Sequence, residues 1–177
     1  MDALRKEAVY TIEDIYALPD GERAELIDGK IYYMAPPNTK HQRLVHFFDR
    51  EIGNYIQRKN GKCEVFPAPF AVFLNENHTN YVEPDISVIC DPDKITDKGC
   101  NGAPDWIIEI VSSGNKSMDY FTKLFKYRTA GVREYWIVDP AKKMITVYRF
   151  EKETMEEYSF DEKVPVGTYE DFSIKVQ

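Results

Sequence analysis

Two acidic residues, Asp85 and Glu109, stand inside segments that are otherwise almost entirely apolar. Glu109 interrupts the run 106–111, and Asp85 follows a proline in the segment 82–89. Runs this apolar are typical of strands that are buried on both faces of a sheet. An ionised carboxylate in such a place costs several kcal/mol unless it is paired or binds a metal. The two acids therefore predict the two halves of one metal site.

A third group of polar residues has helical spacing. Asp119, Lys123 and Tyr127 repeat every four residues in a predicted helix over 116–130, so one face of this helix can turn toward the strand end that carries Glu109. On spacing alone, Asp119 and Lys123 can equally form a simple i,i+4 ion pair worth about 0.2–0.5 kcal/mol.

The rest of the chain supplies the elements that position these residues. Apolar periodicity and turn residues predict helices over 11–18, 38–58 and 116–130, and strands over 23–27, 30–34, 63–66, 70–74, 82–89, 106–111, 134–139, 144–150 and 155–160, with a polar loop over 91–102. Asp28-Gly29 is a strong two-residue hairpin turn, and we expect 63–66 and 70–74 to form a pair of strands. Phe121, Leu124 and Phe125 lie on one side of the last helix. This order indicates an α/β fold with a mixed sheet flanked by helices and peripheral hairpins.

Length and charge set the outer limits. We expect one domain over 1–177, with a core of about 10–150 and an acidic extension over 151–177. Residues 150–177 hold eight acids and three bases, a net charge of −5 within the total of −7. Basic residues gather instead in the segments 40–62 and 116–133, either as solvated helix faces or as phosphate-binding patches.

The cysteines and the hydropathy predict a location. No segment has the roughly 20 apolar residues that span a bilayer, and the N-terminus does not resemble an export signal. Cys63, Cys90 and Cys100 have neither zinc-ligand nor redox-motif spacing, so we expect free thiols in a reducing cytoplasm and no membrane partner.

Taken in order, these motifs resemble the PD-(D/E)XK nuclease superfamily, the restriction-endonuclease-like fold. The resemblance covers about residues 10–150. It is to the branch of bacterial endonucleases expanded in cyanobacteria, and its motifs here are Glu25-Leu26-Ile27-Asp28-Gly29, Met34-Ala35-Pro36-Pro37 before His41-Gln42, Glu83-Pro84-Asp85, Glu109-Ile110-Val111-Ser112, and Gly131 through Pro140.

The resemblance implies Mg²⁺, with Mn²⁺ as a substitute, held by Asp85, Glu109 and the main-chain carbonyl of Ile110. Mg²⁺ prefers such hard oxygen ligands, and it polarises a phosphate ester and lowers the pKa of the attacking water. The superfamily places a lysine two residues after the glutamate, where this chain has Val111. In this branch the lysine is displaced to the following helix, which implies Lys123.

Several weaker assignments accompany that centre. Lys116 and Lys126 are the rivals of Lys123. The resemblance implies that Glu25 lies near the metal, although it can equally be a solvated hairpin acid. His41 heads the apolar stripe of the long helix, where a histidine is more often a satisfied core residue than a catalytic one.

The leading hypothesis is a Mg²⁺-dependent endonuclease that hydrolyses phosphodiester bonds, with DNA as the expected nucleic acid and a homodimer favoured if both strands are cut. The acidic balance and the displaced lysine also suit a catalytically inactive nuclease-fold protein that binds nucleic acid or a protein partner. A two-carboxylate glycosidase needs acids across an open cleft, which two buried strands do not provide.

Overall fold

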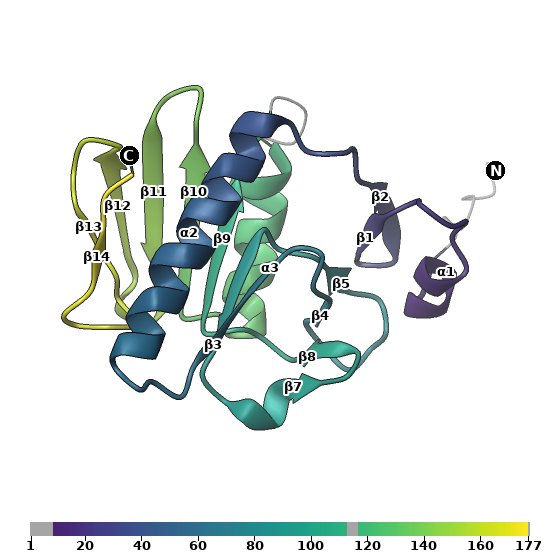
Figure 1. The fold of residues 1–177 in the computed structure, drawn as a ribbon. Helices are drawn as coiled ribbons and strands as arrows, with labels where there is room; N and C mark the ends of the chain where they lie inside the picture. The colour runs from purple at the N-terminus through teal and green to yellow at the C-terminus, as the bar shows by residue number, and fades with distance from the viewer. Residues whose placement is uncertain (1–8, 113–116, 177) are drawn as a thin grey trace.

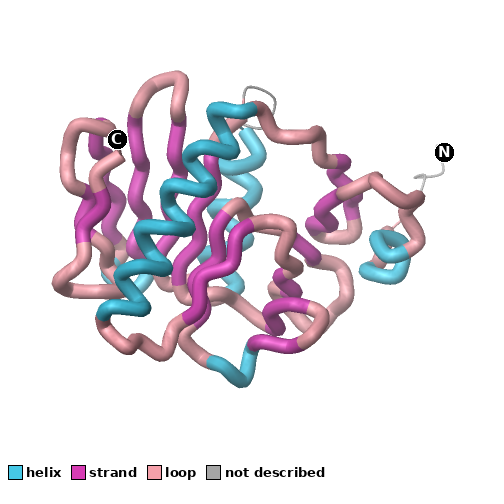
Figure 2. Tube along the Cα trace, viewed as in Figure 1, coloured by secondary structure: helices cyan, strands magenta, loops and turns pink. Residues whose placement is uncertain are grey.

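The computed structural model describes residues 9–112 and 117–176 (Figure 1). A six-stranded mixed sheet forms its centre, in the spatial order β12-β11-β10-β9-β6-β3 (Figure 2). Its strands are β3 (Glu64–Pro67), β6 (Ile86–Ile89), β9 (Trp106–Ile110), β10 (Glu134–Asp139), β11 (Met144–Arg149) and β12 (Thr154–Ser159). The strands β9 and β10 run parallel, and the other neighbouring pairs run antiparallel.

Helices cover both faces of the central sheet. The long helix α2 (Thr39–Arg58) lies across one face, and α3 (Leu124–Ala130) lies on the other (Figure 1). The helix α2 begins where the Asn38 side chain accepts a hydrogen bond from the N–H of His41. Its apolar stripe packs against the sheet, with Phe48 and Ile52 fully buried. Gly131, with a φ of 96°, ends α3.

A second six-stranded sheet packs beside α3 on the same side of the central sheet. Its order is β2-β1-β5-β4-β8-β7, and its strands are β1 (Ala24–Ile27), β2 (Lys30–Tyr33), β4 (Val72–Phe73), β5 (Tyr81–Val82), β7 (Ile95–Thr96) and β8 (Gly99–Asn101). Ile27, Val72 and Val82 from this sheet share one core cluster with Ile107 and Tyr127. The short helix α1 (Ile12–Tyr16) packs on β1.

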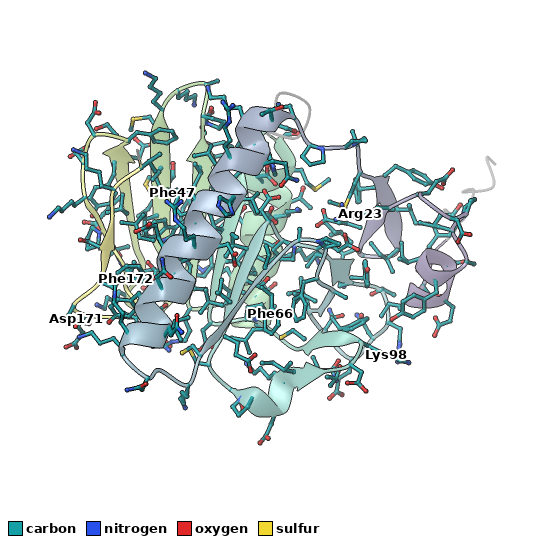
Figure 3. The ribbon with its side chains drawn as sticks, in the orientation of Figure 1. Arg23, Phe47, Phe66, Lys98, Asp171 and Phe172 are labelled. Atoms are coloured by element: carbon teal, nitrogen blue, oxygen red, sulfur yellow. A yellow bond between two sulfur atoms is a disulfide. The ribbon has the colours of Figure 1, made fainter. Side chains whose placement is uncertain are left out.

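The chain after residue 150 is more than an acidic extension. It supplies the edge strand β12 and a two-stranded sheet of β13 (Val164–Pro165) and β14 (Ser173–Ile174). Phe172 stacks on Tyr55 near the C-terminal end of α2, and the neighbouring Asp171 pairs with Lys59 (Figure 3). These late residues therefore contribute to the same core as α2.

The predicted α/β class, with a mixed sheet, flanking helices and a peripheral β11–β12 hairpin, is confirmed. Three predictions about strands are wrong. The segment 82–89 is divided between the two sheets, because Pro84 has no N–H and interrupts the ladder between β5 and β6. The strands β3 and β4 do not pair with each other but belong to different sheets. The polar segment 91–102 contains β7, β8 and a 3-10 helix at Pro92–Lys94.

The expectation of three free thiols is also wrong. Cys63 and Cys90 form a disulfide, and only Cys100 is free and buried. The antiparallel pairing of β3 with β6 sets Glu64 opposite Ile89, which places the two cysteines side by side one residue beyond. A reducing compartment therefore no longer follows from the cysteines. Among the described residues, no helix combines the length and the apolar character needed to cross a bilayer.

Candidate active site

Strand pairing brings Asp85 and Glu109 together at one end of the central sheet. The strand β6 runs antiparallel to β9 with Ile86 opposite Ile108, so Asp85, just before β6, lies next to Glu109. The N–H of Asp85 is 3.4 Å from Oε2 of Glu109. Oδ2 of Asp85 accepts a 2.7 Å hydrogen bond from the N–H of Ile110. The two carboxyl groups therefore occupy one small region, as a shared metal site requires.

The side chain of Lys123 enters this region from the helix that follows β9. Its Nζ lies 2.9 Å from Oε1 of Glu109 and 2.9 Å from Oε2 of Glu25. Oδ1 of Asp119 is 3.9 Å away. These four side chains are each at most 6% exposed. Because Glu25 belongs to β1 and Glu109 to β9, the ammonium links the two sheets.

The helix geometry explains how Lys123 and its neighbours reach the cluster. A wider π-helical turn, Met118–Lys123, precedes α3, and such turns are frequent at functional sites. The four-residue spacing puts Asp119, Lys123 and Tyr127 on the buried side. The Tyr127 hydroxyl donates a 2.6 Å hydrogen bond to Oε1 of Glu109.

The two phenylalanines of this helix are exposed, although their apolar side chains would be expected in the core. Phe121 is 73% exposed and Phe125 is 62% exposed, while Leu124 is partly buried against the core. The polar cluster occupies the buried side of the helix, which leaves the two phenylalanines on the solvent side.

The cluster holds more negative charge than its one ammonium offsets. Burial raises the pKa of Glu109 to about 8, against the lowering effect of Lys123, and the neighbouring Asp85 adds to the rise. Burial likewise raises the pKa of Asp119 to about 7. The pKa of the Lys123 ammonium is raised well above its ordinary value, because the surrounding carboxylates outweigh the cost of burial. Lys123 is therefore a cation held by buried acids.

His41 reaches the same cluster from the start of α2. Its Nε2 lies 3.1 Å from Oδ2 of Asp85, and its buried Nδ1 has no hydrogen-bond partner among the described residues. Burial lowers the pKa of His41, but the hydrogen bond and the charge of Asp85 outweigh it, so the net pKa is raised. The main chain of the nearby Ile110 acts in the same direction. His41 thus lies beside Asp85, and the structure does not place it as an isolated core histidine.

Glu25 is held in place by residues that the sequence analysis did not assign to the site. Its Oε1 accepts a 3.0 Å hydrogen bond from the N–H of Glu83. Glu83 in turn accepts hydrogen bonds from Nε of Arg23, at 2.9 Å, and from the Tyr81 hydroxyl, at 2.7 Å. Glu25 is thus a buried partner of Lys123 and not a solvated hairpin acid. The partners Arg23 and Glu83 are 60 residues apart, and no sequence spacing could have paired them.

The rival lysines are placed differently. Lys126 pairs with the exposed Asp28 on the hairpin turn and does not contact Glu109. Lys116 lies outside the described residues. Of the predicted lysines that are described, Lys123 alone joins the carboxylates.

The residues around Asp85 suit a magnesium ion chemically. Asp85 and Glu109 provide hard oxygen donors, and the surplus of buried carboxylates is a charge that a divalent cation would offset. In a strand the N–H and C=O of one residue point to the same side, so the Ile110 carbonyl faces the side of Asp85 as its N–H does. Within the described residues, however, no three His, Cys, Asp or Glu side chains are already arranged around one ion position.

The raised pKa of Glu109 predicts how metal-free stability depends on pH. A carboxyl group whose pKa rises on folding makes the folded state bind more protons, so stability falls as the pH rises from the unfolded value, near 4.5, to about 8. Urea unfolding in EDTA at pH 5.5 to 8.5 should show this loss, to which the raised pKa values of Asp119 and His41 contribute in the same direction, and Glu109→Gln should reduce it. A wild-type stability that rises across this range, or an equal slope in the variant, would contradict the prediction.

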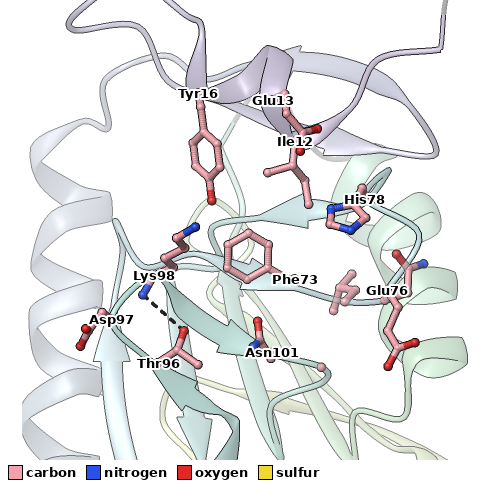
Figure 4. A pocket seen from close by; sticks show the side chains of 13 residues that line it. Ile12, Glu13, Tyr16, Phe73, Glu76, His78, Thr96, Asp97, Lys98 and Asn101 are labelled. Carbon is pink, nitrogen blue, oxygen red and sulfur yellow. Dashed lines mark hydrogen bonds between the residues drawn. The ribbon is translucent and has the colours of Figure 1, made fainter.

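A pocket lies away from this cluster. A cavity of about 840 Å³ opens between α1, the β4–β5 loop and the β7–β8 hairpin, with Tyr16, Phe73 and His78 among its lining residues (Figure 4). None of the clustered acids, Lys123 or His41 lines it. The candidate chemistry therefore lies at the strand ends and not in this cavity.

A mixed sheet between helices, with acids at adjoining strand ends and a lysine from the next helix, defines a restriction-endonuclease-like fold. The chain belongs to the Uma2 family, described as "Putative restriction endonuclease", whose model matches residues 12–177. A crystal structure from Anabaena variabilis, described as a "putative nuclease belonging to DUF820", is similar with a TM-score of 0.76 and 23% identity, over 93% of this chain and 94% of that chain. No curated protein matches the sequence. The superfamily inferred from the motifs is confirmed, and family and fold support nuclease function in general.

Proposed function

We propose that this protein is a metal-dependent endonuclease that hydrolyses phosphodiester bonds in DNA, with Mg²⁺ as the metal and Mn²⁺ as a substitute. The observation that carries the proposal is the position of Lys123. Where the superfamily's lysine is missing, Val111 is buried in the core, and the Lys123 ammonium reaches Glu109 instead. The chain thus keeps two acids and a lysine together although the motif is broken.

Each residue has a role in this proposal. Asp85, Glu109 and the Ile110 carbonyl would hold the metal, which when bound supplies a Lewis acid for the phosphate and for the water. Lys123 orients the water and offsets the charge that develops on the phosphate. Glu25 and Asp119 hold Lys123 in position. His41, next to Asp85, fixes the orientation of that carboxylate.

The test is an incubation of purified protein with plasmid, linear duplex and single strands, each with Mg²⁺, Mn²⁺ or EDTA. We expect cleavage of DNA with either metal and none with EDTA. Nicking alone fits one site, whereas cuts in both strands would support a homodimer. Binding without cleavage under any metal would instead support the inactive nuclease-fold protein, and the proposed activity would be withdrawn.

A further inference from the structure

Most cations near the cluster, on the side of the second sheet, are already neutralised by acids. Lys126 pairs with Asp28, and Arg23 pairs with Glu83. Lys123 is held between buried carboxylates. Arg23 and Lys126 therefore have little positive charge left for the phosphates that flank the one at the cluster.

Two lysines on the opposite side of the cluster are different. Nζ of Lys40 donates a 2.9 Å hydrogen bond to the main-chain carbonyl of Pro140. Nζ of Lys142 lies 5.6 Å from the centre of the Tyr120 ring. Both lysines are exposed, and neither is paired with a carboxylate of the described residues. We refer to Lys40 and Lys142 as the lysine rim.

The lysine rim adjoins the cluster at two points. Lys40 precedes His41, whose ring contacts Asp85. Tyr120, which lies under Lys142, follows Asp119, whose carboxylate is near Lys123. The rim therefore runs along the turn after β10, from the start of α2 to the start of the helix that carries Lys123.

From these contacts we infer that the sugar-phosphate backbone of the substrate crosses the lysine rim. Lys40 and Lys142 contact phosphates that flank the one at the cluster. The inference rests on the proposed nuclease function and adds to it the face that receives the nucleic acid. A chain with a net charge of −7 needs such a local positive surface, because most affinity for nucleic acid comes from phosphate contacts.

The other end of α2 provides a matched control. Arg58 is its last residue, Lys62 follows shortly after it, both are exposed, and a helix of 20 residues is about 30 Å long. Lys40→Gln/Lys142→Gln and Arg58→Gln/Lys62→Gln remove the same charge near opposite ends of this helix. If the whole basic segment attracted DNA, both double variants would weaken binding alike.

The experiment measures binding of a labelled short DNA duplex in EDTA over a range of salt concentrations. Each lost phosphate contact makes the negative slope of log K against log salt shallower by about 0.9. The slope of the rim variant should therefore be shallower than that of wild type by about 1.8. Its affinity deficit relative to wild type should shrink about tenfold between about 50 and about 200 mM salt. Arg58→Gln/Lys62→Gln should keep the wild-type slope.

Equal slopes in the two double variants, or a wild-type slope in the rim variant, would overturn the inference. Cleavage by wild-type protein, measured separately with Mg²⁺, distinguishes the two proposals. If the wild-type protein cleaves DNA but the two double variants have equal slopes, the nuclease function stands and the inferred role of the lysine rim is wrong. If only the rim variant changes the slope and the wild-type protein does not cleave DNA, the lysine rim is a DNA-binding face and the proposed nuclease function is wrong.

Discussion

Lys123→Ala should lower the rate of DNA cleavage by about 10²–10⁴-fold, the usual effect of losing a positioned group that acts on the nucleophile. The ammonium is within hydrogen-bond distance of Glu109 and is almost fully buried, so solvent offers no replacement cation of fixed position. Single-turnover cleavage with saturating Mg²⁺ measures the loss.

The same substitution should change stability in a metal-dependent way. Without its ammonium, the site leaves buried carboxylates at Glu25, Glu109 and Asp119 unpaired, and breaking a buried ion pair costs about 3–5 kcal/mol. Mg²⁺ should then raise the melting temperature of the variant more than that of wild type, because the metal offsets carboxylate charge that the ammonium no longer offsets. A smaller metal shift in the variant would mean that Lys123 is needed for metal binding.

Lysines on or near the same helix provide the controls. Lys126→Ala removes a pair with the exposed Asp28, so it should cost less than about 1 kcal/mol and leave cleavage nearly unchanged. Lys116→Ala is a second change of equal charge. Equal, modest losses of rate in all three variants would indicate a general phosphate-attracting patch, and Lys123 would lose its proposed role.

Asp85→Asn should abolish metal-dependent cleavage and the stabilisation by Mg²⁺ together. A metal contributes several kcal/mol to the transition state, and each 1.36 kcal/mol is tenfold in rate, so we expect a loss of about 10³-fold or more. In EDTA the variant should be as stable as wild type or more so, because one acid is removed from a crowded group of acids.

Melting curves with and without Mg²⁺ separate these effects, and Asp161→Asn, a change at an exposed aspartate, is the matched control. An equal Mg²⁺ shift in wild type and Asp85→Asn would show that the metal binds elsewhere. A large loss of stability in EDTA would show instead that Asp85 serves mainly to anchor the His41 ring and the Ile110 N–H.

The part of the candidate site that lies on a single helix could be predicted from the sequence. The four-residue spacing of Asp119, Lys123 and Tyr127 is a local property, and the structure places all three on the buried side. The Arg23–Glu83 pair that supports Glu25 could not be predicted, because it depends on how two distant strands are brought together. Contacts of this kind are fixed by tertiary packing and leave no pattern in the sequence.

The fold shows the same division. The hairpin at Asp28-Gly29, the helix α2 and the strands β9 and β10 follow from turn residues and apolar periodicity, and they are found where predicted. An apolar run does not, however, indicate which sheet it joins, so the sequence predicts one strand across Pro84 where the structure has two. The disulfide between Cys63 and Cys90 depends on the register of β3 and β6. The number and spacing of the cysteines do not indicate that register.

The contacts of Lys123 have a consequence for the protein during translation. Glu25 and Lys123 are 98 residues apart, and a closure of that length is slow to form. The ribosome makes Glu25, Asp85 and Glu109 before it makes Lys123, so the growing chain holds the acids for a time without the ammonium that joins them. The complete arrangement can form only once the helix after β9 has been released from the ribosome. A nascent chain shorter than this therefore cannot contain the assembled cluster.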